Sequence, residues 1–540
     1  MDIEKFDYVV VGAGAAGCIV ASRLSEDGRN RVLLLEAGPR DTALGLKMPA
    51  AFGVAKMMLP FKWGFETEPE PGLVNRRLPL RMGRVIGGSS SVNGMCYHRG
   101  HPGIYDHWEN LGCSGWGYSD VLPYFLKAET NHARQDEFHG QEGPMHITAG
   151  DDSESGFSNE LDEAFINSGL AMGLQRTYDF DGSVPEGIGY EDRTIYKGVR
   201  MSTSRAYLSE AGKRSNLTVR PDSTVIRLTG ESDKLSSVEY EYKGKKKVAA
   251  AEKEIVLCAG ALMTPHILMH SGVGHADVLE KYGISVKKEL SGVGQNLQNH
   301  PDVVCSFAIN KPVSSNRFTH GLGSIVAGLQ WLLFKRGPVA SNHFVASAFI
   351  RTKPDIEFPD IKLTFLPCCL KDSGEILCKH GFQIDISLTQ PTSPGTVQIG
   401  SADPKVPPKI ALNYLTEAKD MNAMVAAVSF VRQLVFQGEL EQYGTSEMSP
   451  GASMVDADSI EDWIRNSTNT THHGVGTAKM GLESAHDTVV DCRGRLKGFP
   501  NIRIADTSIM PHIVTGGTYG PVIMIAEKIS DHILNLRQAL

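Results

Sequence analysis

The 540-residue chain has no uninterrupted apolar run long enough to cross a bilayer and no basic n-region before its first strand-like pattern, so we expect neither a transmembrane helix nor a signal peptide. Its nine cysteines include no Cys-x-x-Cys pair and no cluster with metal-ligand spacing, which argues against a metal site and suits a reducing compartment. A formal net charge of −8 argues against a nucleic-acid partner. We therefore expect a cytoplasmic protein, and its length predicts two or more domains.

The first strong motif is YVVVGAGAAG at residues 8–17. An apolar β-branched run ends there in Gly-x-Gly-x-x-Gly, and a helical pattern follows over residues 15–24. The glycines permit a tight strand-to-helix turn, the approach of a pyrophosphate and close packing of the helix. A second apolar strand at residues 31–35 ends in Glu36, within reach of a ribose hydroxyl. This context predicts a dinucleotide-binding βαβ unit.

A second motif, GRVIGGSSSVNGM, covers residues 83–95 and follows a segment at 41–80 that reads as an extended excursion. Such a density of glycine and serine in a folded enzyme brings the backbone close to a ligand, and its amides could wrap a phosphate or the edge of a flavin ring. A flexible linker is the alternative, but the apolar residues Val85, Ile86 and Val92 punctuate the stretch and favour the ligand.

These two motifs, together with GALMTPHILMHSGVG at residues 260–274, resemble the glucose–methanol–choline (GMC) oxidoreductases, which bind FAD. The resemblance covers essentially the whole chain and is strongest to the choline dehydrogenase and alkanol dehydrogenase branch. It implies an α/β fold, α+β overall, with a Rossmann-like FAD-binding domain and a substrate domain built on an antiparallel β-sheet flanked by helices. The implied FAD-binding domain comprises residues 1–155, 200–301 and 461–540, and the substrate domain residues 156–199 and 302–460.

The resemblance also implies which residues hold the cofactor. They are Gly12, Gly14, Ala15, Ala16, Glu36, Ala37, Arg84, Gly88, Ser89, Asn93, Gly94, Met95, Val225, Ala259, Gly260, Asp506, Thr518 and Pro521. Val92 stands where some choline oxidases attach FAD covalently through a histidine. Because valine cannot form that bond, we expect FAD to be bound non-covalently.

Hydrophobic periodicity predicts most of the remaining elements. The predicted helices are 106–127, 159–172 and 416–436. The predicted strands are 216–220, 224–228, 254–260, 361–365 and 382–388, the last of which is expected to turn through 391–395 into a hairpin with 396–399.

One apolar run, IVAGLQWLLF at residues 325–334, is followed directly by Lys335 and Arg336. A buried helix is one interpretation. The other is an apolar lid or an edge that contacts a membrane surface, which would make the protein peripheral to the inner face of the membrane.

The chemistry is expected in THHGVGTAKMG at residues 471–481. The resemblance implies that His473 faces the flavin, where an imidazole accepts the hydroxyl proton of an alcohol while flavin N5 takes the hydride. Adjacent histidines on a strand point to opposite faces, so we expect His472 to have a packing or supporting role and no two-histidine metal site.

The sequence departs from the family at two positions near its end. Gly517 stands where the family has a second catalytic His or Asn, and Tyr519 stands where an Asn is common. Three alternatives follow: His473 works alone with water, His472 or Tyr519 takes the second role, or the flavin supports another reaction. The family scaffold also serves hydroxynitrile lyases and fatty-acid photodecarboxylases, so the fold does not settle the reaction.

A further departure concerns the substrate. Choline dehydrogenases resemble Ser341–Arg351 but carry a glutamate where this chain has Val345, next to Phe344. An apolar side chain there would leave a quaternary ammonium unpaired, at a cost of about a few kcal/mol. We therefore expect Val345 and Phe344 to contact a neutral or apolar alcohol, with choline a poor substrate.

The leading hypothesis is an FAD-dependent alcohol dehydrogenase or oxidase that forms an aldehyde and passes electrons to a quinone, a carrier protein or oxygen. A redox-neutral flavin lyase or a photodecarboxylase is the second. A protein that keeps the flavin and serves only binding is the third.

Overall fold

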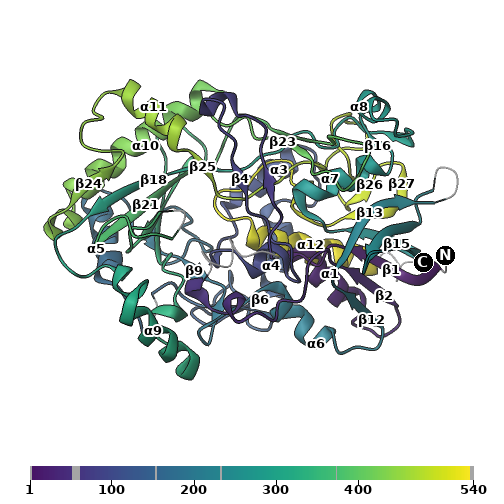
Figure 1. The fold of residues 1–540 in the computed structure, drawn as a ribbon, viewed down its shortest axis with the longest axis horizontal. Helices are drawn as coiled ribbons and strands as arrows, with labels where there is room; N and C mark the ends of the chain where they lie inside the picture. Colours follow the sequence, from purple (N-terminus) through teal and green to yellow (C-terminus); the bar gives the residue numbers. More distant parts are fainter. Residues whose placement is uncertain (1–2, 52–60, 152–154, 231–233, 372–373, 536–540) are drawn as a thin grey trace.

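The computed structural model describes residues 3–51, 61–151, 155–230, 234–371 and 374–535. Two β-sheets dominate it, one toward the end where both termini lie and the other toward the opposite end of the molecule (Figure 1). Helices cover both sheets, and this mixed α/β architecture agrees with the predicted fold class. Among the helices of these described residues, none has the length and apolarity needed to cross a membrane.

The first sheet has eight strands and contains the Rossmann-like unit. Its order is β12-β2-β1-β15-β14-β13, with β27 beside β15 and β26 beside β27. The core of this sheet is parallel, because β1 pairs in parallel with both β2 and β15, and β12 pairs in parallel with β2. The strands are β1 (Ile3–Val11), β2 (Val32–Leu35), β12 (Leu217–Arg220), β13 (Ser223–Thr229), β14 (Ser237–Tyr242), β15 (Lys245–Leu257), β26 (Arg495–Leu496) and β27 (Phe499–Ile504).

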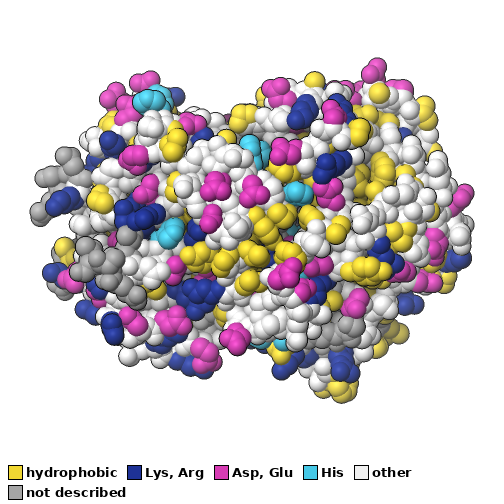
Figure 2. All heavy atoms as spheres, turned by 180° about the vertical axis from the view of Figure 1, so that it is seen from behind, with side chains coloured by type: hydrophobic (Ala, Val, Ile, Leu, Met, Phe, Trp, Pro, Cys, Tyr) yellow, Lys and Arg dark blue, Asp and Glu magenta, His cyan; other side chains and the backbone are white. Residues whose placement is uncertain are grey.

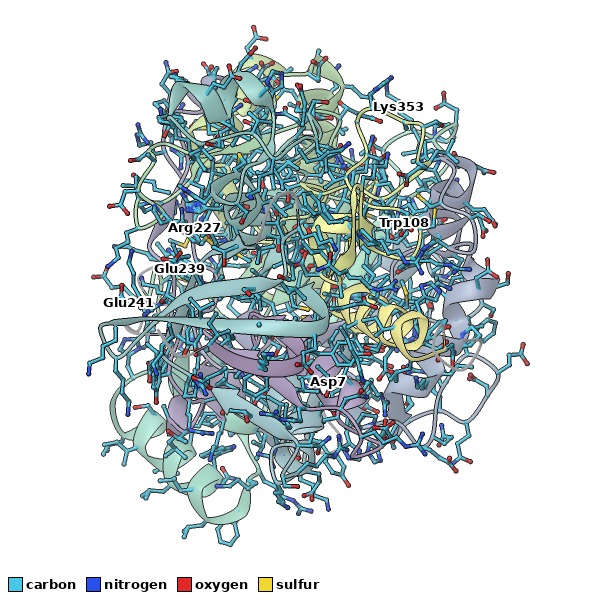
Figure 3. All side chains as sticks on the ribbon, turned by 90° about the vertical axis from the view of Figure 1, so that its right-hand side faces the viewer. Asp7, Trp108, Arg227, Glu239, Glu241 and Lys353 are labelled. Atoms are coloured by element: carbon cyan, nitrogen blue, oxygen red, sulfur yellow. The ribbon has the colours of Figure 1, made fainter. Side chains whose placement is uncertain are left out.

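The strands predicted at residues 31–35, 216–220, 224–228 and 254–260 all lie in this sheet. At its outer edge, β13 and β14 carry charged side chains such as Arg227 and Glu239, whose Nε and Oε2 atoms are 3.0 Å apart (Figure 3). Charges on an edge strand discourage pairing with other chains.

Helix α1 (Ala15–Leu24) begins and ends where the sequence predicted, and it packs against the closing helix α12 (Tyr519–Asn535). A Cβ on Gly17 would lie 1.8 Å from the Gly12 carbonyl oxygen, so this helix approaches its strand as closely as only glycine allows. Arg23 of α1 pairs with the buried Glu527 of α12 at 2.8 Å, which ties the two ends of the chain together.

The second sheet has seven antiparallel strands in the order β24-β18-β21-β20-β19-β8, with β25 beside β18. Alternate residues of each strand face a hydrophobic core, as Val303, Cys305 and Phe307 of β18 do. The strands are β8 (Gly187–Tyr190), β18 (Pro301–Ala308), β19 (Ala346–Ile350), β20 (Ile361–Leu366), β21 (Gly381–Leu388), β24 (Ser446–Ser449) and β25 (Asn469–Thr470).

Helices α5 (Glu160–Ala171) and α10 (Ala418–Phe436) pack on the core face of this sheet, in agreement with the helices predicted at 159–172 and 416–436. Helix α11 (Ala457–Ser467) packs on α10 and spans the domain boundary expected at residue 461.

Two predictions of secondary structure are wrong. Strand β21 forms no hairpin with the segment after it, because β21 pairs with β18 and β20, whereas β22 (Thr396–Gln398) pairs with β23 (Lys409–Ala411). The helix expected over 106–127 is two helices, α3 (Pro102–Asn110) and α4 (Tyr118–Ala128), since a glycine-containing turn separates them.

Helix α7 (Gly260–His270) has 11 residues, and the remaining elements apart from α9 are shorter. Among them are the helices α6 (Ser209–Ala211) and α8 (Ala276–Lys281). The other strands are β3 (Phe65–Glu66), β4 (Pro79–Leu80), β5 (Cys96–Tyr97), β6 (Glu129–Asn131), β7 (Met145–Ile147), β9 (Asp192–Arg193), β10 (Ile195–Tyr196), β11 (Val199–Arg200), β16 (Val273–Gly274) and β17 (Lys288–Glu289). Residues 52–60 of the excursion predicted at 41–80 lie outside the described residues, and its described part contains only short pieces of this kind.

Helix α9 (Gly321–Phe334) contains the apolar run of the sequence, and the interpretation of that run as a buried helix is wrong. Only Ala327 and Trp331 of this helix are buried. The indole of Trp331 donates a hydrogen bond to the Gly198 carbonyl at 2.7 Å, which fixes the helix to the body of the protein.

Candidate active site

A cavity of about 820 Å³ extends from the first βα turn to the second sheet. At one end it is lined by Gly14, Ala15 and Ala16, which begin α1. At the other end it is lined by residues of β18, β20 and β21. Elements of both sheets therefore enclose one space.

The nucleotide end of the cavity is shaped by glycine. Gly12 has a φ of +93°, and a Cβ there would lie 2.6 Å from the Cys258 carbonyl oxygen. Gly88 has a φ of +54°, and a Cβ there would lie 2.7 Å from the Gly14 Cα. The glycine-rich loop thus touches the beginning of α1, where Gly14 offers no side-chain cap to the first amides of the helix. Uncapped amides at a helix N-terminus suit a phosphate, so these residues fit the pyrophosphate of FAD.

Many of the predicted cofactor residues line this cavity, namely Gly14, Ala15, Ala16, Gly88, Ser89, Asn93, Gly94, Met95, Ala259, Gly260, Asp506 and Thr518. Six others are not among the lining residues: Gly12, Glu36, Ala37, Arg84, Val225 and Pro521.

Glu36 has a clear structural role. Its carboxylate accepts hydrogen bonds from the Ala13 amide at 2.9 Å and the Gly38 amide at 2.8 Å, so it joins the ends of β1 and β2. Burial raises the pKa of Glu36 to about 7, although these hydrogen bonds oppose the shift.

Asp506 lies fully inside the protein and also lines the cavity. Its carboxylate accepts hydrogen bonds from the Gly260 amide at 2.8 Å and the Thr264 hydroxyl at 2.7 Å, at the start of α7. Burial raises the pKa of this carboxyl above its ordinary value. Asp506 therefore anchors the helix beside the nucleotide end of the cavity.

His473 lines the cavity and is held by two neighbours from the segment before β18. The Asn299 side chain accepts a hydrogen bond from the His473 amide at 2.7 Å. The Nδ1 atoms of His473 and His300 are 3.0 Å apart, with the two rings nearly perpendicular at 83°.

The partners of His300 define the tautomer of His473. His300 Nε2 lies 3.1 Å from the Val514 carbonyl oxygen, which can only accept, so this nitrogen donates. Burial lowers the pKa of His300 to about 3, so the ring is neutral near pH 7 and its Nδ1 is an acceptor. His473 Nδ1 must then carry the shared proton, and the acceptor lone pair of a neutral His473 lies on Nε2.

His472 also lines the cavity. The argument that two adjacent histidines face opposite ways required a strand, but β25 ends at Thr470 and His472 has a left-handed φ of 65°, so the argument does not apply here. Tyr519 lines the cavity as well, yet its hydroxyl is directed to the Met201 carbonyl oxygen at 3.2 Å. The phenolic hydroxyl is therefore engaged with the protein itself.

Gly517 lines the cavity, and a Cβ built on it meets no atom within 4 Å. The position at which the family carries a second catalytic side chain is thus open space next to the cavity.

The two predicted substrate residues differ in position. Phe344 lines the cavity, whereas Val345 is buried and is not a lining residue; its carbonyl accepts a hydrogen bond from the Glu191 amide at 2.9 Å. The structure thus gives no support to the choice of an apolar alcohol on the basis of Val345.

The second sheet presents a polar face to the cavity. Asp302, Asp385 and Lys362 line it from three neighbouring strands. Lys362 Nζ pairs with the buried Glu191 at 2.5 Å and lies 3.0 Å from His98 Nε2. The carboxylate of Glu191 therefore compensates the charge of Lys362. These three charged side chains make this face of the cavity polar.

Sequence reasoning missed His300, Asn299 and these sheet residues. The signal for the first two was the polar run NLQNHPD at 296–302, directly before a strand, where such a density of amides beside a histidine indicates a built site. Nothing in the local pattern separates Lys362 or Asp385 from ordinary strand residues.

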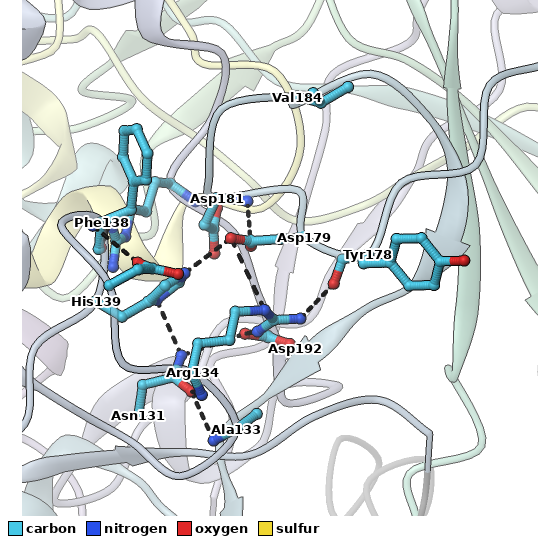
Figure 4. A network of polar contacts seen from close by, with 12 residues as sticks. Asn131, Ala133, Arg134, Phe138, His139, Tyr178, Asp179, Asp181, Val184 and Asp192 are labelled. Atoms are coloured by element: carbon cyan, nitrogen blue, oxygen red, sulfur yellow. Dashed lines mark hydrogen bonds and ion pairs between the residues drawn. The ribbon is translucent and has the colours of Figure 1, made fainter.

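A second cluster contains residue types that ligate metals, namely Asp136, His139 and Asp179. His139 and Asp179 are labelled in Figure 4. His139 Nε2 lies 2.8 Å from Asp179 Oδ2 and its Nδ1 lies 2.9 Å from Glu129 Oε1. Burial alone would lower the pKa of His139, but these two hydrogen bonds outweigh it and raise the pKa to about 9. A protonated imidazole thus joins the carboxylates, and the cluster is an ion-pair network.

Comparison with known proteins identifies the class to which this cavity belongs. The family model described as GMC oxidoreductase matches residues 6–302 with its N-terminal part and residues 391–526 with its C-terminal part. The chain is 40% identical over 529 residues to an oxygen-dependent choline dehydrogenase of Rhizobium etli, covering 98% of this chain and 95% of that protein. It is 38% identical to the protein of the same name from Photobacterium profundum, covering 98% and 93%.

Among solved structures, pyridoxine 4-oxidase from Mesorbium loti aligns with a TM-score of 0.87 and 30% identity, covering 97% of this chain and 98% of that one. Formate oxidase aligns with a TM-score of 0.91 and 25% identity over both complete chains. The chain belongs to the GMC oxidoreductase family. It is an FAD-dependent oxidoreductase that acts on alcohols.

Proposed function

We propose that the chain oxidises an alcohol to an aldehyde with His473 as the general base. The observation that carries this proposal is the hydrogen bond between His473 Nδ1 and His300 Nδ1, because it leaves the acceptor lone pair of His473 on Nε2. A positioned base of this kind contributes roughly a hundredfold to ten-thousandfold to a rate. FAD, when bound, supplies the hydride acceptor, and the residues that would hold it are those at the start of α1, in the glycine-rich loop and at the start of α7.

The residues around His473 suit proton transfer. Asn299 orients the backbone of His473, and His300 holds its ring through Nδ1. The hydroxyl proton is accepted at Nε2, which gives a doubly protonated imidazolium. His300 Nδ1, still an acceptor, stabilises that cation through the hydrogen bond it already receives.

Gly517 supports a second candidate, a redox-neutral lyase or a photodecarboxylase. Gly517 has no side chain, so it cannot bind a substrate oxygen as the family's second catalytic residue would at this position. Water could fill the open space in an alcohol oxidase, whereas a larger substrate group would fill it in the alternative.

We infer that FAD is held without a covalent bond, because Val92 lines the cavity and offers no nucleophile. Acid precipitation should therefore release all of the yellow chromophore into the supernatant. Oxygen is the first acceptor to test, since the relatives from Rhizobium etli and Photobacterium profundum are named oxygen-dependent. Quinones and carrier proteins are the alternatives.

The substrate proposal follows from the carboxyl groups that line the cavity. Asp302 and Asp385 both line it, so an alcohol with a cationic or hydrogen-bonding group is favoured over a purely apolar alcohol. This replaces the preference argued from Val345, which is not a lining residue.

Anaerobic mixing with choline, a polyol and a medium-chain alkanol tests the reaction class and the substrate preference together. Bleaching of the flavin band with stoichiometric aldehyde supports alcohol oxidation. Product without bleaching would favour a lyase, and product only under illumination would favour a photodecarboxylase. Fastest bleaching by the alkanol would contradict the role given to the two aspartates.

A further inference from the structure

Helix α9 presents an apolar ridge to solvent. Six of its large apolar side chains are more than half exposed: Leu322, Ile325, Val326, Leu329, Leu333 and Phe334. Five of them follow spacings of three, four and seven residues and share one side of the helix, opposite the buried Trp331. In an ordinary surface helix the outer side is polar, so this helix is oriented against the usual pattern.

The helix projects from the body of the protein, as seen in Figure 1 and from a second direction in Figure 3. In the view from behind, hydrophobic side chains lie beside Lys and Arg side chains at this lower edge (Figure 2). Most exposed apolar residues of the chain are scattered singly, which needs no explanation, whereas a contiguous ridge indicates a binding surface.

The charges around α9 indicate what binds there. Residues 303–354 contain no Asp or Glu, although the whole chain has a net charge of −8. Within that stretch Arg317 is exposed just before the helix and Arg336 just after it. Lys335 closes the helix, with its Nζ atom 3.2 Å from the Leu332 carbonyl oxygen and 3.9 Å from the Trp331 ring centroid.

We propose that α9 lies in the surface of an anionic lipid bilayer, with its apolar ridge among the acyl chains and its flanking cations at the phosphate headgroups. A helix of 14 residues is too short to span a bilayer but has the combination of an apolar side and cationic ends that interfacial helices use. In a contact between two copies of this chain through α9, the cations of one copy would face the same cations of the other. Such a contact has no charge complementarity, which favours an anionic lipid surface.

This contact adjoins the active-site cavity. Ser324 and Gly328, on the inner side of α9, line the cavity together with Phe318 and Val339 from the flanking segments. Docking of the ridge therefore brings one wall of the cavity to the lipid surface. The proposal is independent of the reaction, because lipid binding is measured without turnover.

The test is flotation of the FAD-loaded protein with vesicles of phosphatidylcholine alone or of equal parts phosphatidylcholine and phosphatidylglycerol. We expect binding to the mixed vesicles, much weaker binding to phosphatidylcholine, and a loss of about tenfold in affinity between low and high salt because headgroup attraction is screened. Leu329→Ser/Leu333→Ser should weaken partitioning by about a hundredfold, roughly tenfold for each leucine removed from lipid. Arg317→Gln/Arg336→Gln should weaken binding to mixed vesicles only.

The matched control is Val455→Ser/Leu482→Ser, which removes two exposed apolar side chains from other parts of the surface and should leave flotation unchanged. Unchanged flavin absorbance verifies that each variant is folded. Failure of the parent protein to float with mixed vesicles overturns the proposal, as does equal flotation of the leucine variant. Sedimentation without lipid tests whether the ridge instead joins two copies of the chain. If the protein self-associates, the leucine variant does not, and neither binds lipid, the ridge is a contact between copies.

Discussion

The hydrogen bond between His300 and His473 gives the sharpest test of the proposed base. Replacement of His300 by alanine removes the acceptor of the His473 Nδ1 proton, so the two neutral tautomers of His473 are no longer distinguished by this contact. Because this hydrogen bond stabilises the imidazolium that forms on His473, its net value is about 1.5–3 kcal/mol, which corresponds to a loss of about tenfold to about a hundredfold in the rate of flavin bleaching. That loss should be smaller than the loss caused by removing the base itself.

His300→Ala also leaves the Val514 carbonyl without its donor, which is expected to destabilise the fold by about 1–3 kcal/mol. His300→Asn separates the two effects, since its amide oxygen can occupy the place of Nδ1 and restore the acceptor. Stopped-flow bleaching under anaerobic conditions measures the rate, and the absorbance of bound flavin controls for cofactor loss. The reasoning is refuted if His300→Ala bleaches at the parent rate, or if the asparagine variant binds flavin but recovers no rate.

Four further predictions follow from the same structure. His473→Ala should slow anaerobic bleaching by roughly a hundredfold to ten-thousandfold while flavin content is retained, and normal bleaching would assign the base elsewhere. Gly12→Ala should abolish flavin binding, because φ is +93° and the new Cβ would lie 2.6 Å from a carbonyl oxygen, whereas Gly517→Ala, with no atom within 4 Å, should retain full flavin absorbance. Asp302→Asn/Asp385→Asn should raise the KM for choline at least about tenfold with little change for a neutral alkanol, and equal changes for both would show that neither carboxylate senses substrate charge. The pKa of His139 is raised to about 9, so its ion pairs contribute their full stability below the unfolded-state pKa of about 6.5. This contribution, at most about 3 kcal/mol, is lost as the pH rises through 9. The urea midpoint should therefore fall more steeply over that pH range in the parent protein than in His139→Gln.

Local sequence determined the nucleotide end of this protein. The βα turn after β1, the start and end of α1 and the parallel strands β2 and β15 follow from glycine spacing and continuous apolar runs, which act over a few neighbouring residues. The position of His473 was likewise available from a motif. The pairing partner of a strand could not be predicted in the same way. Strand β21 pairs with β18 and β20 and not with the strand that follows it, because a local turn signal carries no information about distant strands.

Only the tertiary structure decided what surrounds the reactive histidine. His300 lies 173 residues before His473 in the chain, and their contact depends on how the segment before β18 meets the segment after β25. The same packing brings Asp302, Asp385 and Lys362 to the wall of the cavity and leaves Val345 out of it. It also leaves the apolar side of α9 exposed to solvent. An apolar run in the sequence indicates that burying this helix would be favourable, but only the fold determines whether the protein itself covers it.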